Sequence, residues 1–357
     1  MDMCILLCLF RQVPEGLGCG GNYGSSTRDQ DSREGFHKGG PEKDRYTEVA
    51  ADSHNRGCTE VHVVITMEVL YYPGCSLKNT YPEFEKSTYE ACEKLGIELV
   101  EIPEWSCCGV VPSLATDNVM RHLGAVRSFI NAQDKGREIG TNVIVILCSM
   151  CYNVLKRVNL ILKEETDTLE NVNDFIDDQP NYVAELSVTH FLTFLKETGF
   201  EKLQEKVNRP LTGLKVAAYY GCALLRPNKP QGVPIDDPDN PVILENLVKS
   251  IGAEPVHFPF RAECCGNYHI VLEPSIAEMR TKKIIGSAKS ERADLILSPC
   301  PLCTYNLERG NESLDRSERV PVVFFTQLLA LALGGKSYLP IEVEEEILEK
   351  IGGEKSD

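Results

Sequence analysis

Short apolar runs alternate along the chain with longer stretches whose apolar residues recur at helical spacing. In the first half the apolar runs predict strands at residues 69–72, 98–102 and 142–147. The longer stretches predict helices at 82–95 and 116–132, from residue 152 onwards, and at 189–198. The acidic stretch 164–180 is interpreted as a solvated helix and loop. The second half repeats this order, with strands at 215–220, 254–259 and 295–298 and helices at 241–251 and 274–292.

Strands that alternate with helices predict a mainly parallel sheet covered by helices. The expected fold class is therefore α/β, with two pseudo-repeated Rossmann-like halves. We expect the first half to span residues 67–210 and the second 211–357, because Asn208, Pro210 and Gly213 interrupt the pattern between them.

Residues 1–66 differ from the rest, because Gly, Ser, Asp, Arg and His occur there in no periodic arrangement. Such a segment buries too little apolar surface to offset its ordering entropy. We interpret it as a disordered extension or as a non-native one, with the natural start at Met67. Four cysteines of this segment are given no role: Cys4, Cys8, Cys19 and Cys58.

The net charge of the 357-residue chain is -16, which argues against nucleic acid and, more weakly, against an anionic membrane surface. The sequence has no apolar run long enough for a membrane span. The apolar residues 1–10 lack the basic flank and the length of a signal peptide. These observations predict a cytoplasmic protein.

Ten of the fifteen cysteines form two copies of one pattern. Each copy has a single cysteine, then an adjacent pair followed by glycine, then a C-x-x-C. The first set is Cys75, Cys107, Cys108, Cys148 and Cys151, and the second is Cys222, Cys264, Cys265, Cys300 and Cys303. The neighbouring residues repeat too, with Tyr-Tyr before the first cysteine of each set and Asn-Val-Leu or Asn-Leu after the last. The chain therefore contains an internal duplication.

Each of these cysteine positions follows a predicted strand. Parallel strands end at one edge of a sheet, where open α/β folds bind ligands. The five thiols of each half should therefore gather at the carboxyl edge of its sheet. We expect two such sites, facing one another across a pseudo-two-fold axis.

Three kinds of chemistry could use these thiols. Disulfide frameworks belong to small secreted domains, unlike this large chain. Structural zinc uses four ligands and would leave one cysteine over in each set. An iron–sulfur cluster spreads several irons over a few ångströms and can use five thiolates, including an adjacent pair. The pattern favours a cluster, with a zinc-stabilised scaffold as the alternative. Cys92, inside a predicted helix, is expected to be a buried small apolar residue.

The spacings C-x31-CC-x39-C-x-x-C and C-x41-CC-x34-C-x-x-C resemble the duplicated cysteine-rich CCG domain. Because no ferredoxin-type cysteine run is attached, the chain is most similar to the B subunit of heterodisulfide reductase from methanogenic archaea. The resemblance covers Met67 to about Tyr338. The spacings of 39 and 41 are longer than the commonest form of the motif and predict loop insertions without loss of ligands.

The resemblance implies that each set of five cysteines binds a noncubane 4Fe-4S cluster, with no flavin or nucleotide in this chain. It implies a small-molecule substrate, the mixed disulfide of coenzyme M and coenzyme B, reduced to two thiols in methanogenesis. Electrons would come from a ferredoxin-like C subunit, itself fed by a flavin-containing A subunit, with hydrogenase or formate dehydrogenase upstream. The alternative is an electron-transfer subunit of another oxidoreductase, such as one for 2-hydroxy acid or succinate oxidation or a sulfur-oxidising relative.

Other side chains near the cysteines are weaker candidates. His269, Tyr268 and Tyr72 could supply a proton or could be purely structural. Both substrate halves are anionic, so basic residues near the cysteines could bind them or be solubilising charges: Lys78, Arg226 and Lys229. Four glycines are expected to allow close backbone approach to the clusters: Gly74, Gly109, Gly221 and Gly266.

Overall fold

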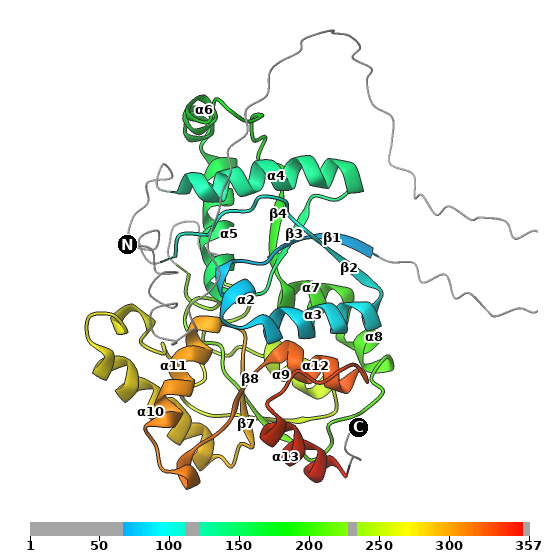
Figure 1. Ribbon diagram of the computed structural model, residues 1–357, viewed down its shortest axis with the longest axis vertical. Helices are drawn as coiled ribbons and strands as arrows, with labels where there is room; N and C mark the ends of the chain where they lie inside the picture. Colours follow the sequence, from blue (N-terminus) through cyan, green and yellow to red (C-terminus); the bar gives the residue numbers. More distant parts are fainter. Residues whose placement is uncertain (1–66, 111–121, 228–233, 353–357) are drawn as a thin grey trace, which may run out of the picture. The chain divides into compact units, whose positions relative to one another are not determined.

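The computed structural model describes residues 67–110, 122–227 and 234–352 (Figure 1). The expectations for residues 1–66 and for Lys229 lie outside these residues, as does the start of the helix expected at 116–132. Within the described ranges the chain forms two four-stranded sheets, and every strand pair in them is parallel. This arrangement confirms the α/β class with one sheet in each half.

The first sheet has the strand order β2-β1-β3-β4. Its strands are β1 (Met67–Tyr72), β2 (Ile97–Glu101), β3 (Val143–Ile146) and β4 (Ser187–His190). The helices of this half are α2 (Cys75–Asn79), α3 (Pro82–Leu95), α4 (Leu123–Ile139), α5 (Ser149–Glu164), α6 (Thr166–Phe175), α7 (Phe191–Thr198) and α8 (Phe200–Glu205). In Figure 1, α4 and α5 lie on one side of the strands and α3 and α7 on the other. Because helices cover both faces, every residue of β3 can be apolar, and all but the first are buried.

The second sheet has the matching order β6-β5-β7-β8. Its strands are β5 (Lys215–Ala218), β6 (Glu254–Val256), β7 (Leu295–Ser298) and β8 (Val322–Phe324). Its helices are α9 (Ile243–Ser250), α10 (Pro274–Ser290), α11 (Pro301–Glu312), α12 (Phe325–Ala332) and α13 (Ile341–Ile351), with the short 3-10 helices η3 (Asn267–His269) and η4 (Arg316–Glu318). The shared strand order confirms that the sequence repeat is also a repeat of fold.

Several elements differ from the sequence expectation, which had no counterpart for helices α2, α8, α11, α12 and α13. The segment expected as a helix at 189–198 begins with strand β4, which passes into α7 without a loop. Strand β8 passes into α12 in the same way, and it was not expected. Helix α4 continues past residue 132 to Ile139 and ends at Gly140, whose φ of 74° suits a helix C-terminus. In both the β4–α7 and the β8–α12 segments the helix begins directly after the strand, so no turn residues in the sequence mark the boundary.

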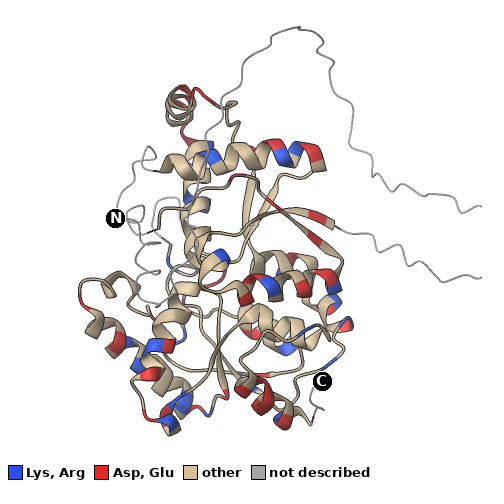
Figure 2. Cartoon of the chain, in the orientation of Figure 1, with Lys and Arg blue, Asp and Glu red and all other residues tan. Residues whose placement is uncertain are grey.

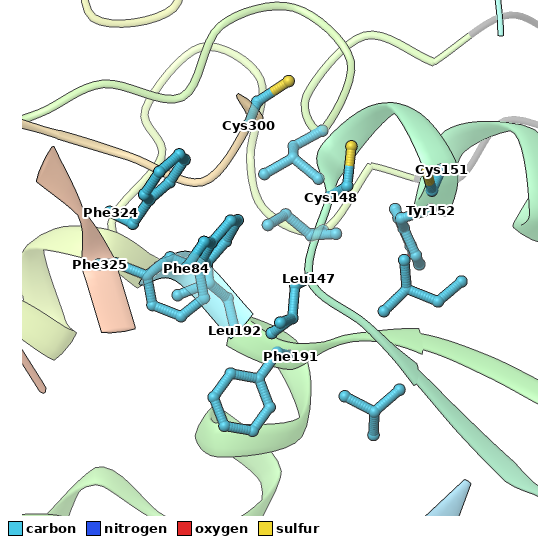
Figure 3. Close-up of a cluster of buried hydrophobic side chains, with 14 of the residues drawn as sticks. Phe84, Leu147, Cys148, Cys151, Tyr152, Phe191, Leu192, Cys300, Phe324 and Phe325 are labelled. Carbon is cyan, nitrogen blue, oxygen red and sulfur yellow. The ribbon is translucent and has the colours of Figure 1, made fainter. Parts of the chain in front are cut away.

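The two halves pack together through helices α3 and α12. The rings of Phe84 and Phe324 are stacked, with centroids 4.1 Å apart, and Phe325 lies edge-on to Phe84. The hydroxyls of Ser87 and Thr326 share a hydrogen bond of 2.7 Å. Figure 3 shows these phenylalanine rings side by side in one buried cluster. The chain crosses between the halves through residues 206–214, the segment that holds the expected boundary at 210.

Charged side chains are distributed unevenly over the fold (Figure 2). Helix α13 carries several glutamates, whereas the first turns of α5 and α11 contain no acidic residue. Among the described residues, no helix has both the length and the apolar character needed to cross a bilayer.

Candidate functional site

The ten repeated cysteines lie where the strands end. Cys75 follows β1, the Cys107–Cys108 pair follows β2, and Cys148 follows β3. The second half has the same arrangement after β5, β6 and β7. Because the strands of each sheet are parallel, these loops meet at one edge. The expected gathering of cysteines in each half is therefore confirmed.

The thiols of the first set form a continuous series of contacts. The Sγ atoms of Cys75 and Cys107 are 3.8 Å apart. Cys108 is in hydrogen-bonding contact with both Cys107 and Cys151, and Cys151 with Cys148. None of the eleven cysteines in the described ranges forms a disulfide. All five thiols of the set are therefore neighbours in reduced form.

The second set has the same series of contacts. Cys222 contacts Cys264, which contacts Cys265. Cys265 contacts Cys303, which contacts Cys300. Each contact joins the residues that match those of the first set, so the repeat extends from the sequence to the arrangement of sulfur atoms.

The two sets meet at Cys148 and Cys300, whose side chains are in hydrogen-bonding contact. Each of these cysteines is the N-cap residue of a helix, Cys148 of α5 and Cys300 of α11. The Oγ of Ser149 donates to the Pro299 carbonyl at 3.0 Å and holds the two helix starts together. In Figure 3 both sulfur atoms lie at the edge of the apolar cluster and point away from the phenylalanine rings. The ten thiols thus form one contiguous series.

Two tyrosines support the cysteine loops in the same way in both halves. The Tyr72 hydroxyl donates to the carbonyl of Ser106, just before the first cysteine pair, at 2.7 Å. The Tyr219 hydroxyl donates to the carbonyl of Glu263, just before the second pair, also at 2.7 Å. Burial, and then the neighbouring cysteines, raise the pKa of both tyrosines. They therefore remain protonated donors that fix the position of each pair.

Two glycines bring the backbone close to the last cysteine of each set. Gly74 has φ of 74°, and a Cβ there would lie 3.0 Å from the Cys151 sulfur. Gly221 has φ of 67°, and a Cβ there would lie 3.1 Å from the Cys303 sulfur. Both the backbone conformation and the close approach therefore require glycine.

The contacts between thiols divide them into thiolates and thiols. Hydrogen bonds from Cys151 and Cys300 lower the pKa of Cys148 to about 5. Those from Cys222 and Cys265 lower the pKa of Cys264 to about 2. The partners keep their protons, and the contact with Cys148 raises the pKa of Cys300 to about 12. Each set therefore favours one thiolate, the form that binds metal.

The second set also has N–H donors directed at its sulfur atoms. The backbone N–H of Gly266 donates to Cys264 Sγ at 3.3 Å, and Asn306 Nδ2 donates to Cys265 Sγ at 3.5 Å. Together with Met150 and Ser149 of the first half, the second set lines a small cavity. Asn267 and Tyr268 contribute to the same lining. Sequence reasoning missed Asn306, because an asparagine within a helix is common and its partner lies 41 residues away.

The other side chains singled out in the sequence differ in their exposure and in their partners. His269 is exposed on η3 and is not among the residues that line the cavity, whereas its neighbour Tyr268 is. The Lys78 ammonium is bound by the carboxylates of Glu85 at 2.8 Å and Glu101 at 2.6 Å. The exposed Arg226 donates to the Ala262 carbonyl. Cys92 is buried in α3, as expected for a small apolar residue.

The two sets bring ten cysteine sulfurs together. In residues 67–110, 122–227 and 234–352, no group of three or more His, Cys, Asp or Glu side chains is arranged as the ligands of one metal ion. Thiolates are the soft ligands that iron–sulfur clusters and zinc prefer. Ten contiguous reduced thiols, with two glycines that let the backbone approach Cys151 and Cys303 closely, therefore fit a group that binds several sulfurs in each half.

Comparison with solved structures supports the fold. A hypothetical protein from Helicobacter pylori superposes with a TM-score of 0.57 at 10% sequence identity. The match covers 80% of this chain and 52% of the other. At this identity the likeness concerns the fold alone.

Comparison of sequences identifies the family. The family described as the cysteine-rich CCG domain matches twice, at residues 69–156 and 216–308. The chain is 34% identical to the 8-methylmenaquinol:fumarate reductase membrane anchor subunit of Wolinella succinogenes, over 75% of this chain and 92% of the relative. It is 32% identical to the B subunit of the ferredoxin/F420H2-dependent CoB–CoM heterodisulfide reductase of Methanosarcina acetivorans, over 74% of this chain and 88% of the relative. With two copies of the matched domain and oxidoreductase subunits among its relatives, the chain belongs to the CCG cysteine-rich domain family.

Proposed function

We propose that the chain is the catalytic subunit of a heterodisulfide reductase and that each set of five cysteines binds one noncubane 4Fe-4S cluster. The observation that carries this proposal is the contiguous series of ten reduced thiols, in two matched sets that meet at Cys148 and Cys300. Five thiols in each set exceed the four that zinc or an ordinary cubane cluster requires. The relative in Methanosarcina acetivorans supports the same assignment.

The proposed reaction is the reduction of the coenzyme M–coenzyme B disulfide. The S–S bond breaks, two electrons and two protons are taken up, and two thiols leave. When bound, the two clusters supply the electrons, one from each. Because the two sets of cysteines adjoin, one disulfide can lie close to both sites. The role of the chain itself is to hold the two sites together, through Ser149 and the tyrosine-supported loops.

Side chains near the cysteines are proposed to serve the substrate. Tyr268 lines the cavity, and the proposed proton donor His269 follows it in η3. Arg226 and Lys229 follow Cys222 and are proposed to attract the anionic groups of the substrate. Lys78 is a weaker candidate for this role, because the carboxylates of Glu85 and Glu101 already bind its ammonium and offset its charge.

The electrons must come from partner subunits. We propose a ferredoxin-like C subunit, supplied by a flavin-containing A subunit, with hydrogenase or formate dehydrogenase upstream and a cytoplasmic location. The chain would then act within a complex, since the reaction requires a supply of single electrons.

The relative in Wolinella succinogenes favours a second candidate function, that of an electron-transfer subunit in a quinol-linked fumarate reductase. In that case the two adjoining sites would conduct electrons toward a separate catalytic subunit, with no disulfide as substrate. Both candidates require the same clusters and differ in substrate.

The test has two stages. Protein purified without oxygen should contain about eight irons and about eight sulfides per chain with little zinc, as expected for two 4Fe-4S sites. Two zincs and no iron would overturn both redox functions. The complex purified from its source is then assayed with reduced viologen, using the heterodisulfide or fumarate as oxidant. Turnover with the heterodisulfide supports the first candidate, and turnover with fumarate alone supports the second.

A further inference from the structure

The two cysteine sets differ at two matched positions. Directly after the Cys-Cys-Gly motif, the first half has Val110 and the second has Asn267. Three residues after the last cysteine, the first half has Val154 and the second has Asn306. At both positions an apolar side chain in the first half is replaced by an amide in the second. The first half does have Asn153 one position earlier, but its amide donates to the Ala223 carbonyl at 2.9 Å.

Asn306 is directed at the second set. It lies one helical turn after Cys303 on α11, so both side chains project from the same face of the helix. Its side chain is 2% exposed, and its Nδ2 lies 3.5 Å from the Cys265 sulfur. Val154 has the same position relative to Cys151 on α5 and is fully buried. A valine cannot donate a hydrogen bond to a sulfur atom.

Asn267 lies beside the same set of cysteines. It is 8% exposed and lines the cavity that holds Cys264 and Cys265. Within the described part of the chain, its Nδ2 has no hydrogen-bond partner. A buried amide donor without an acceptor is unfavourable. The donor is therefore placed to serve an acceptor bound among these thiols.

We infer that Asn306 and Asn267 make the two cluster sites unequal, giving the second site the higher reduction potential. This inference rests on the proposed function, since it requires clusters at both sets. Reduction adds negative charge to a cluster, and N–H donors to its sulfurs stabilise that charge. A single electron given to the chain by an external one-electron reductant therefore resides at the second site.

The test measures the two reduction midpoints of the cluster-loaded protein by redox titration with EPR detection. The wild type should show two midpoints. Asn306→Val should lower the upper midpoint and leave the lower one unchanged. We expect about a tenfold smaller equilibrium constant for reduction, which is about 59 mV for one electron. The reciprocal change Val154→Asn should raise the lower midpoint, and Cys108→Ser identifies the midpoint of the first site by removing it.

A matched control lies on the same helix. The Asn311 amide donates to the Val320 carbonyl at 2.7 Å and to no sulfur, so Asn311→Val should leave both midpoints in place. If Asn306→Val loses iron, Asn306→Leu, which is closer in shape to asparagine, takes its place. Unchanged midpoints in the iron-loaded variants, or equal shifts at both sites, would overturn the inference. A wild-type chain that binds no iron would instead overturn the proposed function.

Discussion

The thiol of Cys148 contacts the thiol of Cys300, although 152 positions separate them in the chain. Each cysteine begins a helix at the end of the third strand of its half. This contact turns two separate five-cysteine sets into one series of ten. Disruption of one cysteine set should therefore stop a reaction that needs both sites. The five cysteines of the other set should remain in place as ligands.

Cys265→Ser should abolish the second site and spare the first. Cys265 is buried and contacts both Cys264 and Cys303, so a serine there removes a central thiol of its set. We expect about half of the wild-type iron, as one of two 4Fe-4S sites remains, and no turnover. Iron analysis and EPR measure this outcome. The control is Cys92→Ala, which removes a cysteine outside both sets; full activity of Cys265→Ser would contradict the two-cluster mechanism.

Gly221→Ala should weaken the second site without removing a ligand. The positive φ disfavours any residue with a Cβ by about 1–2 kcal/mol. The new methyl group would also lie 3.1 Å from the Cys303 sulfur. We expect a lower Tm and a loss of iron. Gly286→Ala is the control, because Gly286 lies in α10 and a Cβ there would have nothing within 4 Å. This change should stabilise the protein by up to about 1 kcal/mol, since alanine is the better helix former.

Phe84→Ala should loosen the contact between the halves. Phe84 is fully buried and stacks on Phe324 across the α3–α12 interface. Truncation of a buried phenylalanine costs about 3–5 kcal/mol, which chemical denaturation will measure. Phe175 in α6 is 61% exposed, so Phe175→Ala should change the free energy of unfolding by less than about 0.5 kcal/mol. Equal effects in the two variants would show that the α3–α12 contact contributes little.

The stability of the fold should fall in acid through His190. Burial lowers the pKa of His190 from 6.5 to about 3. The neutral ring bonds the Leu147 carbonyl through Nε2, while Nδ1 accepts from the Leu192 N–H. The pKa of His190 is lower in the folded than in the unfolded protein. The contribution of the neutral ring to the free energy of unfolding is therefore fully present above pH 6.5 and is lost as the pH falls toward 3.

The measurement is the free energy of unfolding between pH 7 and pH 4, where His190 should contribute a slope of up to about 1.4 kcal/mol per pH unit. His190→Gln keeps a donor and an acceptor but does not titrate in this range. We expect the variant to lose this part of the slope while remaining folded at pH 7. An unchanged slope would assign the acid sensitivity to other groups.

Some elements could be predicted from the sequence because their signals are local. Helix α3 has the bounds expected from its apolar spacing, with Pro82 at its start and Gly96 at its end. Strand β7 likewise has the bounds expected from its apolar run. Strands β4 and β8 could not be predicted, because each is short and merges with the helix that follows it.

The sequence by itself determined the duplication, the alternation of strands and helices and the two sets of cysteines, since all of these are patterns along the chain. The tertiary structure decided which thiols touch, because helix packing between the halves brings Cys148 to Cys300. It also decided that Asn306 faces a cysteine of the second set. Such contacts depend on the direction of side chains from packed helices, and residue spacing alone does not define that direction.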